Sequence, residues 1–240
     1  MSSARFDLAI IGAGPAGMAA AVEARRLNLS VAVLDDQPAA GGQILRGITT
    51  SGRTDYEKWG APLAEAFKAS GAEHIKGAAV WGREGPLLVY GRQGRTESID
   101  AQGIILATGS MERPCVVPGN TLPGVVTAGA LQSLLKGSGC VPAGRFVLVG
   151  NGPLLLLCAV QLAEAGAKPA AIIQTTPRFR FRSALPKVPG LLCDPALLLK
   201  GLGLMSKVRR HGIPVHGEAA NIRIEGGDQV SAIQIGRAHV

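Results

Sequence analysis

Aromatic side chains are scarce in this sequence. Phe, Trp and Tyr together make up 4% of the 240 residues, whereas hydrophobic residues reach 47% and glycine occurs 33 times. Small residues let helices approach sheets closely, so this composition favours an α/β fold over a β-sandwich. The length suits one large domain or two ordinary ones, each with enough material for a core.

The four cysteines are too far apart for any CxxC motif: Cys115, Cys140, Cys158 and Cys193. Their spacing argues against a thioredoxin-reductase-type disulfide exchange within this chain, and against a zinc or iron–sulfur site. The four histidines are similarly dispersed, so we predict no metal site. We expect the cysteines to be buried structural thiols.

Long apolar runs are also missing. No stretch approaches the roughly 18 residues of a membrane span, and the apolar start at Leu8 is too short and glycine-rich for a signal peptide. We therefore expect a cytoplasmic protein without a membrane span. The net charge of +8 comes mostly from dispersed basic residues, and few aromatic side chains are present to stack on bases. We predict no nucleic-acid partner, because the charge is explained by attraction of anionic nucleotides or of an acidic partner subunit.

A phosphate-binding pattern opens the chain in DLAIIGAGPAGMAAA. The run from Leu8 to Ile11 reads as a buried parallel strand, and Gly12, Gly14 and Gly17 follow at GxGxxG spacing before an alanine-rich helix. Such glycines permit a tight turn, close approach of a diphosphate, and close helix–strand packing. Asp35 ends the next strand 23 residues after Gly12, near the position expected for a ribose-binding carboxylate.

Two later segments add glycines and polar residues close in sequence to the ends of predicted strands. DDQPAAGGQI places Gly42 and Gln43 just beyond Asp35, and GIILATGS at 103–110 ends a buried strand in Ala107, Thr108 and Gly109. A polar loop residue and a glycine turn at a strand end also occur without any cofactor, so these residues alone leave the function open.

Together with RPCVVPGNTLPGVVTAGALQ at 113–132, these motifs resemble the flavoprotein oxidoreductases with two dinucleotide-binding domains. The resemblance is strongest to the FAD-binding subunits of amine and opine dehydrogenases, with relatives in sarcosine oxidase and hydrogen cyanide synthase. It runs from about Asp7 to Gln234. It implies FAD as a cofactor, a small-molecule substrate, and a partner oxidase or dehydrogenase subunit in which the substrate is typically oxidised. It also implies FAD contacts from Gly12, Gly14, Pro15, Ala16, Gly17, Asp35, Gly42, Gln43, Ala107, Thr108 and Gly109.

A second copy of the pattern, RFVLVGNGPLLLL, starts at Arg145 and predicts a further nucleotide site at Gly150, Gly152 and Pro153. Leu155 stands where the first copy has Gly17, and Gln174 stands where it has the ribose acid, so a strict preference for NAD is not expected. Arginines at 178, 180 and 182 suit either a 2′-phosphate of NADP or a solvated basic loop. The second site could therefore take NAD(P), another nucleotide or nothing.

We predict two Rossmann-like dinucleotide-binding domains: residues 1–112 form the N-terminal part of the FAD domain and residues 113–234 form the second domain. The resemblance implies that the second domain is inserted in the first. The last six residues, IGRAHV at 235–240, read as a non-native tail, and we expect the FAD domain to lack its C-terminal part. Gly227 and Asp228 read as a hairpin turn. The resemblance implies that the chain takes part in flavin-dependent oxidation of an opine, sarcosine, proline, glycine or similar amine. The alternative is a nucleotide-binding module without turnover.

Overall fold

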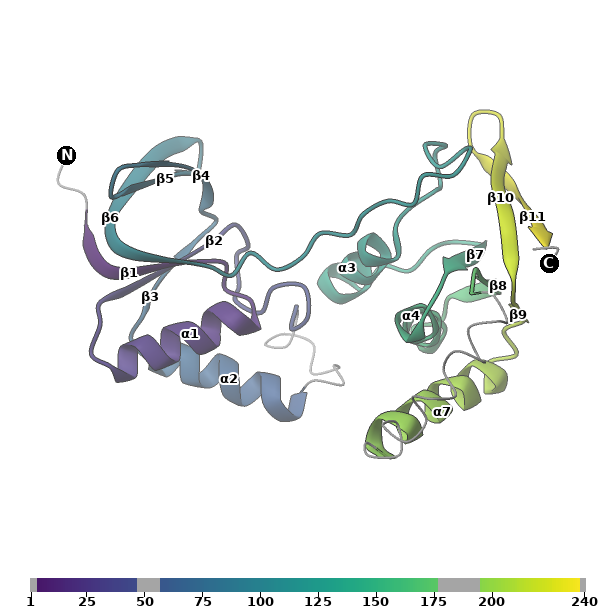
Figure 1. The fold of residues 1–240 in the computed structure, drawn as a ribbon, viewed down its shortest axis with the longest axis horizontal. Helices are drawn as coiled ribbons and strands as arrows, with labels where there is room; N and C mark the ends of the chain where they lie inside the picture. The colour runs from purple at the N-terminus through teal and green to yellow at the C-terminus, as the bar shows by residue number, and fades with distance from the viewer. Residues whose placement is uncertain (1–3, 47–56, 177–194, 238–240) are drawn as a thin grey trace. The chain divides into compact units, whose positions relative to one another are not determined.

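The computed structural model describes residues 4–46, 57–176 and 195–237, and the chain divides into unit 1, Met1–Met111, and unit 2, Glu112–Val240 (Figure 1). Unit 1 contains β1 (Arg5–Ile11), α1 (Pro15–Arg26), β2 (Val31–Asp35), α2 (Glu57–Ala69), β3 (Glu73–Lys76), β4 (Ala79–Glu84), β5 (Leu87–Arg92) and β6 (Arg95–Leu106). Unit 2 contains α3 (Ala128–Ser138), β7 (Arg145–Gly150), α4 (Pro153–Glu164), β8 (Lys168–Gln174), α7 (Pro195–Arg210), β9 (Val215–His216), β10 (Ala219–Gly226) and β11 (Val230–Arg237).

Unit 1 is built on a six-stranded sheet in the order β3-β2-β1-β6-β5-β4. The first four of these strands are parallel, and β6, β5 and β4 form an antiparallel meander. Strand β6 belongs to both parts, because Arg95–Asp100 pairs with β5 while its second half pairs with β1. The carboxyl ends of β1, β2 and β6 meet at one edge of the sheet.

The parallel strands read as continuous apolar runs because both of their faces are covered. All five residues of β2 are buried. On one face, α1 and α2 pack over β1 and β2 (Figure 1). Met18, Ala21 and Ala24 of α1 lie in the core at helical spacing. Helix α2 buries Phe67 in the core of unit 1, although Trp59 remains 45% exposed.

Unit 2 contains a three-stranded parallel sheet in the order β7-β8-β9 and a separate hairpin of β10 and β11. Helix α4 supplies most of the core, with Cys158, Ala159 and Leu162 fully buried against β8 and α7. Helix α3 was not predicted, although Thr127 before it and Gly139 after it are ordinary cap residues.

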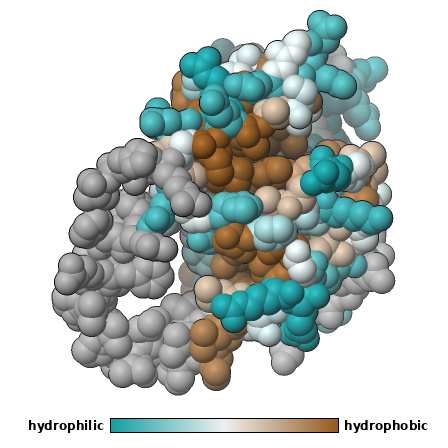
Figure 2. Space-filling model, turned by 90° about the vertical axis from the view of Figure 1, so that its right-hand side faces the viewer, coloured by the Kyte–Doolittle hydropathy of each residue, from teal (hydrophilic) through white to brown (hydrophobic). Residues whose placement is uncertain are grey.

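The β10–β11 hairpin alternates apolar and polar residues: Ile222 and Ile224 are half-buried, whereas Arg223 and Glu225 are exposed. Apolar side chains also gather in patches bordered by hydrophilic ones on the face shown in Figure 2. The predicted turn at residues 227–228 joins the two strands. Strand β11 continues to Arg237, so part of the predicted tail at 235–240 is in a strand: Gly236 and Arg237 pair with Ala220 and Ala219 of β10.

The expectation that the cysteines are buried is wrong for two of them. Cys115 and Cys140 are exposed, and Cys158 is buried in α4. Burial raises the pKa of the Cys158 thiol to about 11, with the Glu112 carboxylate adding to the effect. Cys193 lies outside the described residues.

Candidate nucleotide site

The glycine loop between β1 and α1 is a tight turn packed against two neighbouring strands. Gly12 has φ +105°, and its N–H donates to the Leu34 carbonyl of β2 at 2.7 Å. A Cβ at Gly12 would overlap the carbonyl of Ala107, and a Cβ at Gly17 would overlap the carbonyl oxygen of Gly12. Both positions therefore need glycine, and the helix begins as close to the strand as its backbone permits.

The amino terminus of α1 is open for an anion. Its first N–H groups have no partner within the helix. No side chain caps it at Gly14, Pro15 follows directly, and no acidic residue lies in the first turn. Helix α3 differs, because Thr127 Oγ1 accepts from Ala130 N at 3.3 Å. An uncapped helix end with a positive dipole is a ready site for a diphosphate.

Asp35, the only charged residue buried among those described, stands at the carboxyl end of β2 beside this turn. Its Oδ2 accepts from Ala13 N, and its Oδ1 accepts from Gln37 N at 2.7 Å. A carboxylate has about four acceptor sites, so each oxygen keeps a lone pair for a further donor. The two hydroxyls of a ribose are donors of the right kind, whereas the neighbouring Asp36 is exposed.

The GGQ segment lies over the glycine loop. Gly41 N donates to the Ala13 carbonyl at 2.8 Å, and a Cβ at Gly42 would lie 2.9 Å from the Cα of Gly14. Gln43, the next residue, is exposed. The close contact between two glycine backbones leaves the α1 amino terminus bordered by the 41–43 segment.

The ATG segment borders the same place from the other side. Ala107 N donates to the Ile11 carbonyl at 2.8 Å, which keeps the end of β6 next to the end of β1. Thr108 and Gly109 follow and are exposed, and Gly109 has φ +74°. Thus the glycine loop, Asp35, the GGQ segment and the ATG segment, which the sequence proposed separately, lie together at one sheet edge. The glycine loop, the amino terminus of α1 and Asp35 fit the adenosine and diphosphate parts of a dinucleotide.

The second glycine loop has a different geometry. Gly152, with φ +82°, precedes α4, whose amino terminus also lacks a side-chain cap and an acidic residue. Leu155 is buried, with Cδ1 3.7 Å from the position of a Cβ on Gly150. Thr175 N donates to the Gly150 carbonyl at 3.0 Å. An anion could bind at α4, but the described residues that end β8 include no carboxylate to hold a ribose. The arginines at 178, 180 and 182 lie outside the described residues.

Glu112 has a role that the sequence reasoning missed. In the structure, Glu112 Oε2 accepts from Gly129 N at 2.6 Å, so this carboxylate caps α3. The sequence signal that could have indicated this role is Thr127, a typical N-cap residue, because the first backbone N–H groups of a helix need hydrogen-bond acceptors.

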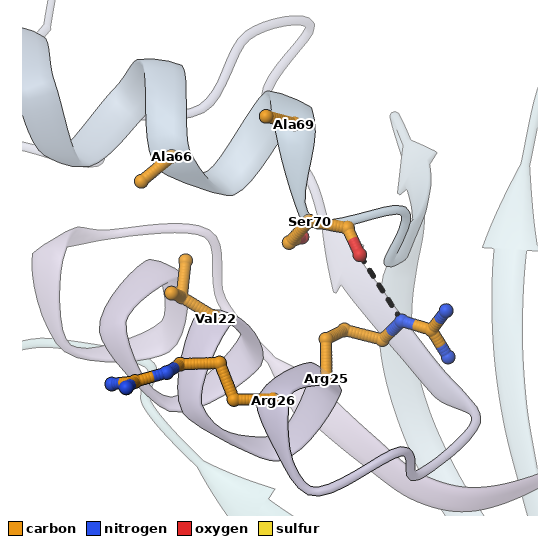
Figure 3. Close-up of a pocket in the computed structure, with 6 residues that line it drawn as sticks. All are labelled: Val22, Arg25, Arg26, Ala66, Ala69 and Ser70. Atoms are coloured by element: carbon orange, nitrogen blue, oxygen red, sulfur yellow. Dashed lines mark hydrogen bonds between the residues drawn. The ribbon is translucent and has the colours of Figure 1, made fainter.

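A shallow groove of about 230 Å³ lies between the carboxyl-terminal halves of α1 and α2 (Figure 3), lined by Val22, Arg25, Arg26, Ala66, Ala69 and Ser70. Arg25 Nε donates to the Ser70 carbonyl at 3.2 Å, and its Nη1 donates to the Leu29 carbonyl at 2.7 Å. At a rise of 1.5 Å per residue, Arg25 stands roughly 16 Å along the helix from Gly14. This groove therefore lies away from the candidate site, and Arg25 joins the ends of two helices.

Among the residues described, no group of three or more His, Cys, Asp or Glu side chains could hold a metal ion. In the same part of the chain, no helix combines the length and the apolar character that crossing a bilayer requires.

The fold and this site define an α/β protein with a Rossmann-type dinucleotide-binding unit. Residues 6–232 match the pyridine nucleotide-disulphide oxidoreductase family, and the chain belongs to that family of flavin-dependent oxidoreductases. Membership implies FAD as the cofactor, together with NAD(P) binding.

Curated relatives match over nearly the whole chain. An opine oxidase subunit of Agrobacterium tumefaciens is 45% identical over 95% of this chain and 48% of its own length. A hydrogen cyanide synthase subunit of Pseudomonas aeruginosa is 32% identical over 94% of this chain and 50% of its own length. The chain thus spans about half the length of these relatives.

Two solved structures show the same fold at low identity. L-proline dehydrogenase from P. horikoshii superposes with a TM-score of 0.60 at 21% identity, covering 97% of this chain and 40% of that one. Thioredoxin reductase from T. acidophilum gives 0.61 at 20% identity, covering 96% and 70%. At these identities the likeness concerns the fold alone.

Proposed function

We propose that this chain is the FAD-binding part of a flavin-dependent oxidoreductase subunit. This subunit takes part in the oxidation of a small amino acid or secondary amine, such as an opine, sarcosine, proline or glycine, and passes the electrons on through its flavin. The names of the relatives, which are subunits of opine oxidase, hydrogen cyanide synthase and sarcosine oxidase, support this substrate class. Because all of them are named as subunits, they also support a partner oxidase or dehydrogenase subunit.

The observation that carries the proposal is the buried carboxylate of Asp35 beside the uncapped amino terminus of α1. Burying a charged group is costly, and two backbone N–H donors only partly replace its water. A ribose diol would supply the remaining donors, while the diphosphate would take the N–H groups and dipole of α1. One residue thus recognises the sugar and one helix end recognises the phosphates.

The residues of this chain bind and orient the cofactor. FAD, when bound, supplies the acceptor for a hydride from the substrate. The proposed diphosphate contacts are Gly12, Gly14, Pro15, Ala16 and Gly17, whereas Gly42, Gln43, Ala107, Thr108 and Gly109 would border the path towards the flavin. Among the described residues around this site we identify no acid–base pair, which suits a subunit whose partner oxidises the substrate.

For the second glycine loop we propose a nucleotide phosphate at the amino terminus of α4, contacted by Gly150, Gly152 and Pro153. The uncapped helix end supports an anion there. Because Gln174, rather than an acid, ends β8, the ligand could be NAD(P) or another nucleotide.

The experiment is an FAD titration of the purified chain, followed by quenching of flavin fluorescence, with Asp35→Asn compared with Asp36→Asn. Hydrogen bonds to charged groups contribute about 1.5–3 kcal/mol, so Asp35→Asn should weaken FAD roughly 10- to 100-fold. Asp36 is exposed, and its variant removes the same charge, so its dissociation constant should stay within about twofold of wild type.

Circular dichroism of both variants checks that they are folded. Equal affinities for the two variants would remove Asp35 from the site. A wild-type chain that binds ADP-ribose but no FAD would instead support the alternative, a nucleotide-binding module without turnover.

A further inference from the structure

Leu45 ends the short turn that carries Gly42 and Gln43. Its side chain is fully buried in the core cluster between the sheet and the two helices of unit 1, together with Ala13 and Met18. Gln43 and Ile44, directly before it, are exposed. The turn therefore exposes two residues and places the next one in the core.

The backbone of the turn is fixed at its other end. Gly41 N donates to the Ala13 carbonyl at 2.8 Å, and Leu45 N donates to the Gly41 carbonyl at 3.0 Å. Gly41 has φ +134°, and a Cβ there would lie 2.7 Å from the Leu45 carbonyl oxygen. The turn is thus as tight as a glycine permits. It can hold this shape only while Gly41 and Leu45 both stay in place.

The position of this turn decides what lies over the amino terminus of α1. Gly42 touches Gly14 through backbone atoms alone, a contact with no side chain that could adjust. If Leu45 left the core, Gly42 would lose its support on one side, and the turn would move away from Gly14. Because the interior around Leu45 is close-packed, a smaller side chain at this position would leave a cavity and loosen the turn.

We propose that Leu45 is a positioning residue: by anchoring the turn at 41–45 in the core of unit 1, it holds Gly42 and Gln43 where the flavin-proximal half of FAD binds. This inference rests on the proposed binding of FAD in unit 1. The adenosine and diphosphate contacts, Asp35 and the end of α1, are held by other bonds. Loss of the Leu45 side chain therefore weakens FAD more than it weakens ADP.

The test compares Leu45→Ala with Leu88→Ala, a matched control. Leu88 on β5 is 2% exposed and packs in the core cluster that does not include Leu45, so both variants lose the same side-chain atoms from unit 1. Dissociation constants for FAD and ADP are measured with each folded variant, together with the visible spectrum of bound FAD. Leu45→Ala should weaken FAD about 10-fold or more and ADP less than threefold, with a changed flavin spectrum.

Leu88→Ala should leave both affinities within twofold of wild type and the spectrum unchanged. Leu45→Met conserves volume and should restore wild-type FAD binding and spectrum. Should Leu45→Ala not fold, Leu45→Val removes less volume, and the same preferential loss of FAD over ADP is expected from it.

If Leu45→Ala weakens the affinities for FAD and ADP equally, or if the two alanine variants have equal effects, Leu45 contributes only to the stability of unit 1 and the inference is overturned. Wild-type affinity for FAD in Leu45→Ala would overturn it as well, while leaving the proposed function intact. A wild-type chain that binds no FAD would overturn both.

Discussion

Replacing Gly17 with alanine should separate α1 from β1. A Cβ at Gly17 would overlap the Gly12 carbonyl oxygen, lie 3.0 Å from the Gly12 carbonyl carbon, and lie 3.4 Å from the Ala107 Cβ. The first two atoms belong to the backbone, which cannot rotate away as a side chain can. The amino terminus of α1 must therefore move.

Two effects of opposite sign set the magnitude. Alanine is favoured over glycine inside a helix by about 1 kcal/mol. Overpacking costs about 1–3 kcal/mol, and more where backbone has to shift. The clash in Gly17→Ala falls in that more costly class, so after subtraction of the helix preference we expect a net loss of about 2–3 kcal/mol in the free energy of unfolding of unit 1. For a unit of this size, the unfolding midpoint should fall by roughly 8–15 °C.

Thermal unfolding followed by tryptophan fluorescence measures this directly, because the two tryptophans of the chain, Trp59 and Trp81, both lie in unit 1. Gly203→Ala in α7 is the control: nothing lies within 4 Å of a Cβ there, so it should stabilise unit 2 by about 0.5–1 kcal/mol, measured by circular dichroism. If Gly17→Ala unfolds at or above the wild-type midpoint, the close packing of α1 on β1 does not require glycine at position 17, and the reasoning is refuted.

Three further predictions concern single side chains. Arg25→Ala should destabilise unit 1 by about 1–2 kcal/mol in urea unfolding, because the carbonyls of Ser70 and Leu29 lose their donor. Arg26→Ala removes only an exposed ion pair and should stay within about 0.5 kcal/mol of wild type. Equal losses in the two variants would contradict this prediction. Burial lowers the pKa of His74 below its ordinary value of 6.5. The free energy of unfolding of unit 1 should therefore decrease as the pH falls from above 6.5 through the folded pKa, and His74→Gln should weaken this pH dependence. An unchanged slope of stability against pH in the variant would argue against this role of His74. At pH 8, iodoacetamide should label Cys115 in the native protein and Cys158 only after unfolding, because Cys158 is buried and its thiol has a pKa of about 11. Mass spectrometry of the labelled peptides measures this. Labelling of Cys158 in the native protein would count against its burial.

Much of the first unit could be predicted because its signals are local. The apolar run before Gly12, the spacing of the glycines and the acid at the end of β2 each follow from a short stretch of chain. The turn at residues 227–228, in the second unit, was predicted for the same reason. Local backbone preference and hydrophobic periodicity are sufficient for features of this kind.

The roles of Glu112, Cys115 and Cys140 could not be predicted from the sequence, because they depend on parts of the chain that are distant in sequence. Glu112 caps α3 through Gly129, 17 residues later, and its sequence neighbours carry no sign of this. Cys115 and Cys140 are exposed although cysteine is usually buried, because exposure depends on which elements pack over a position.

The sequence by itself determined that this protein has two glycine loops on strand–helix units, with a carboxylate after the first and an amide after the second. Only the tertiary structure decided that Asp35, Gly42 and Ala107 border one helix end, and that Leu45 anchors the segment between them. The physical reason is that backbone preferences act over a few residues, whereas close packing and buried hydrogen bonds join segments that the chain brings together only by folding.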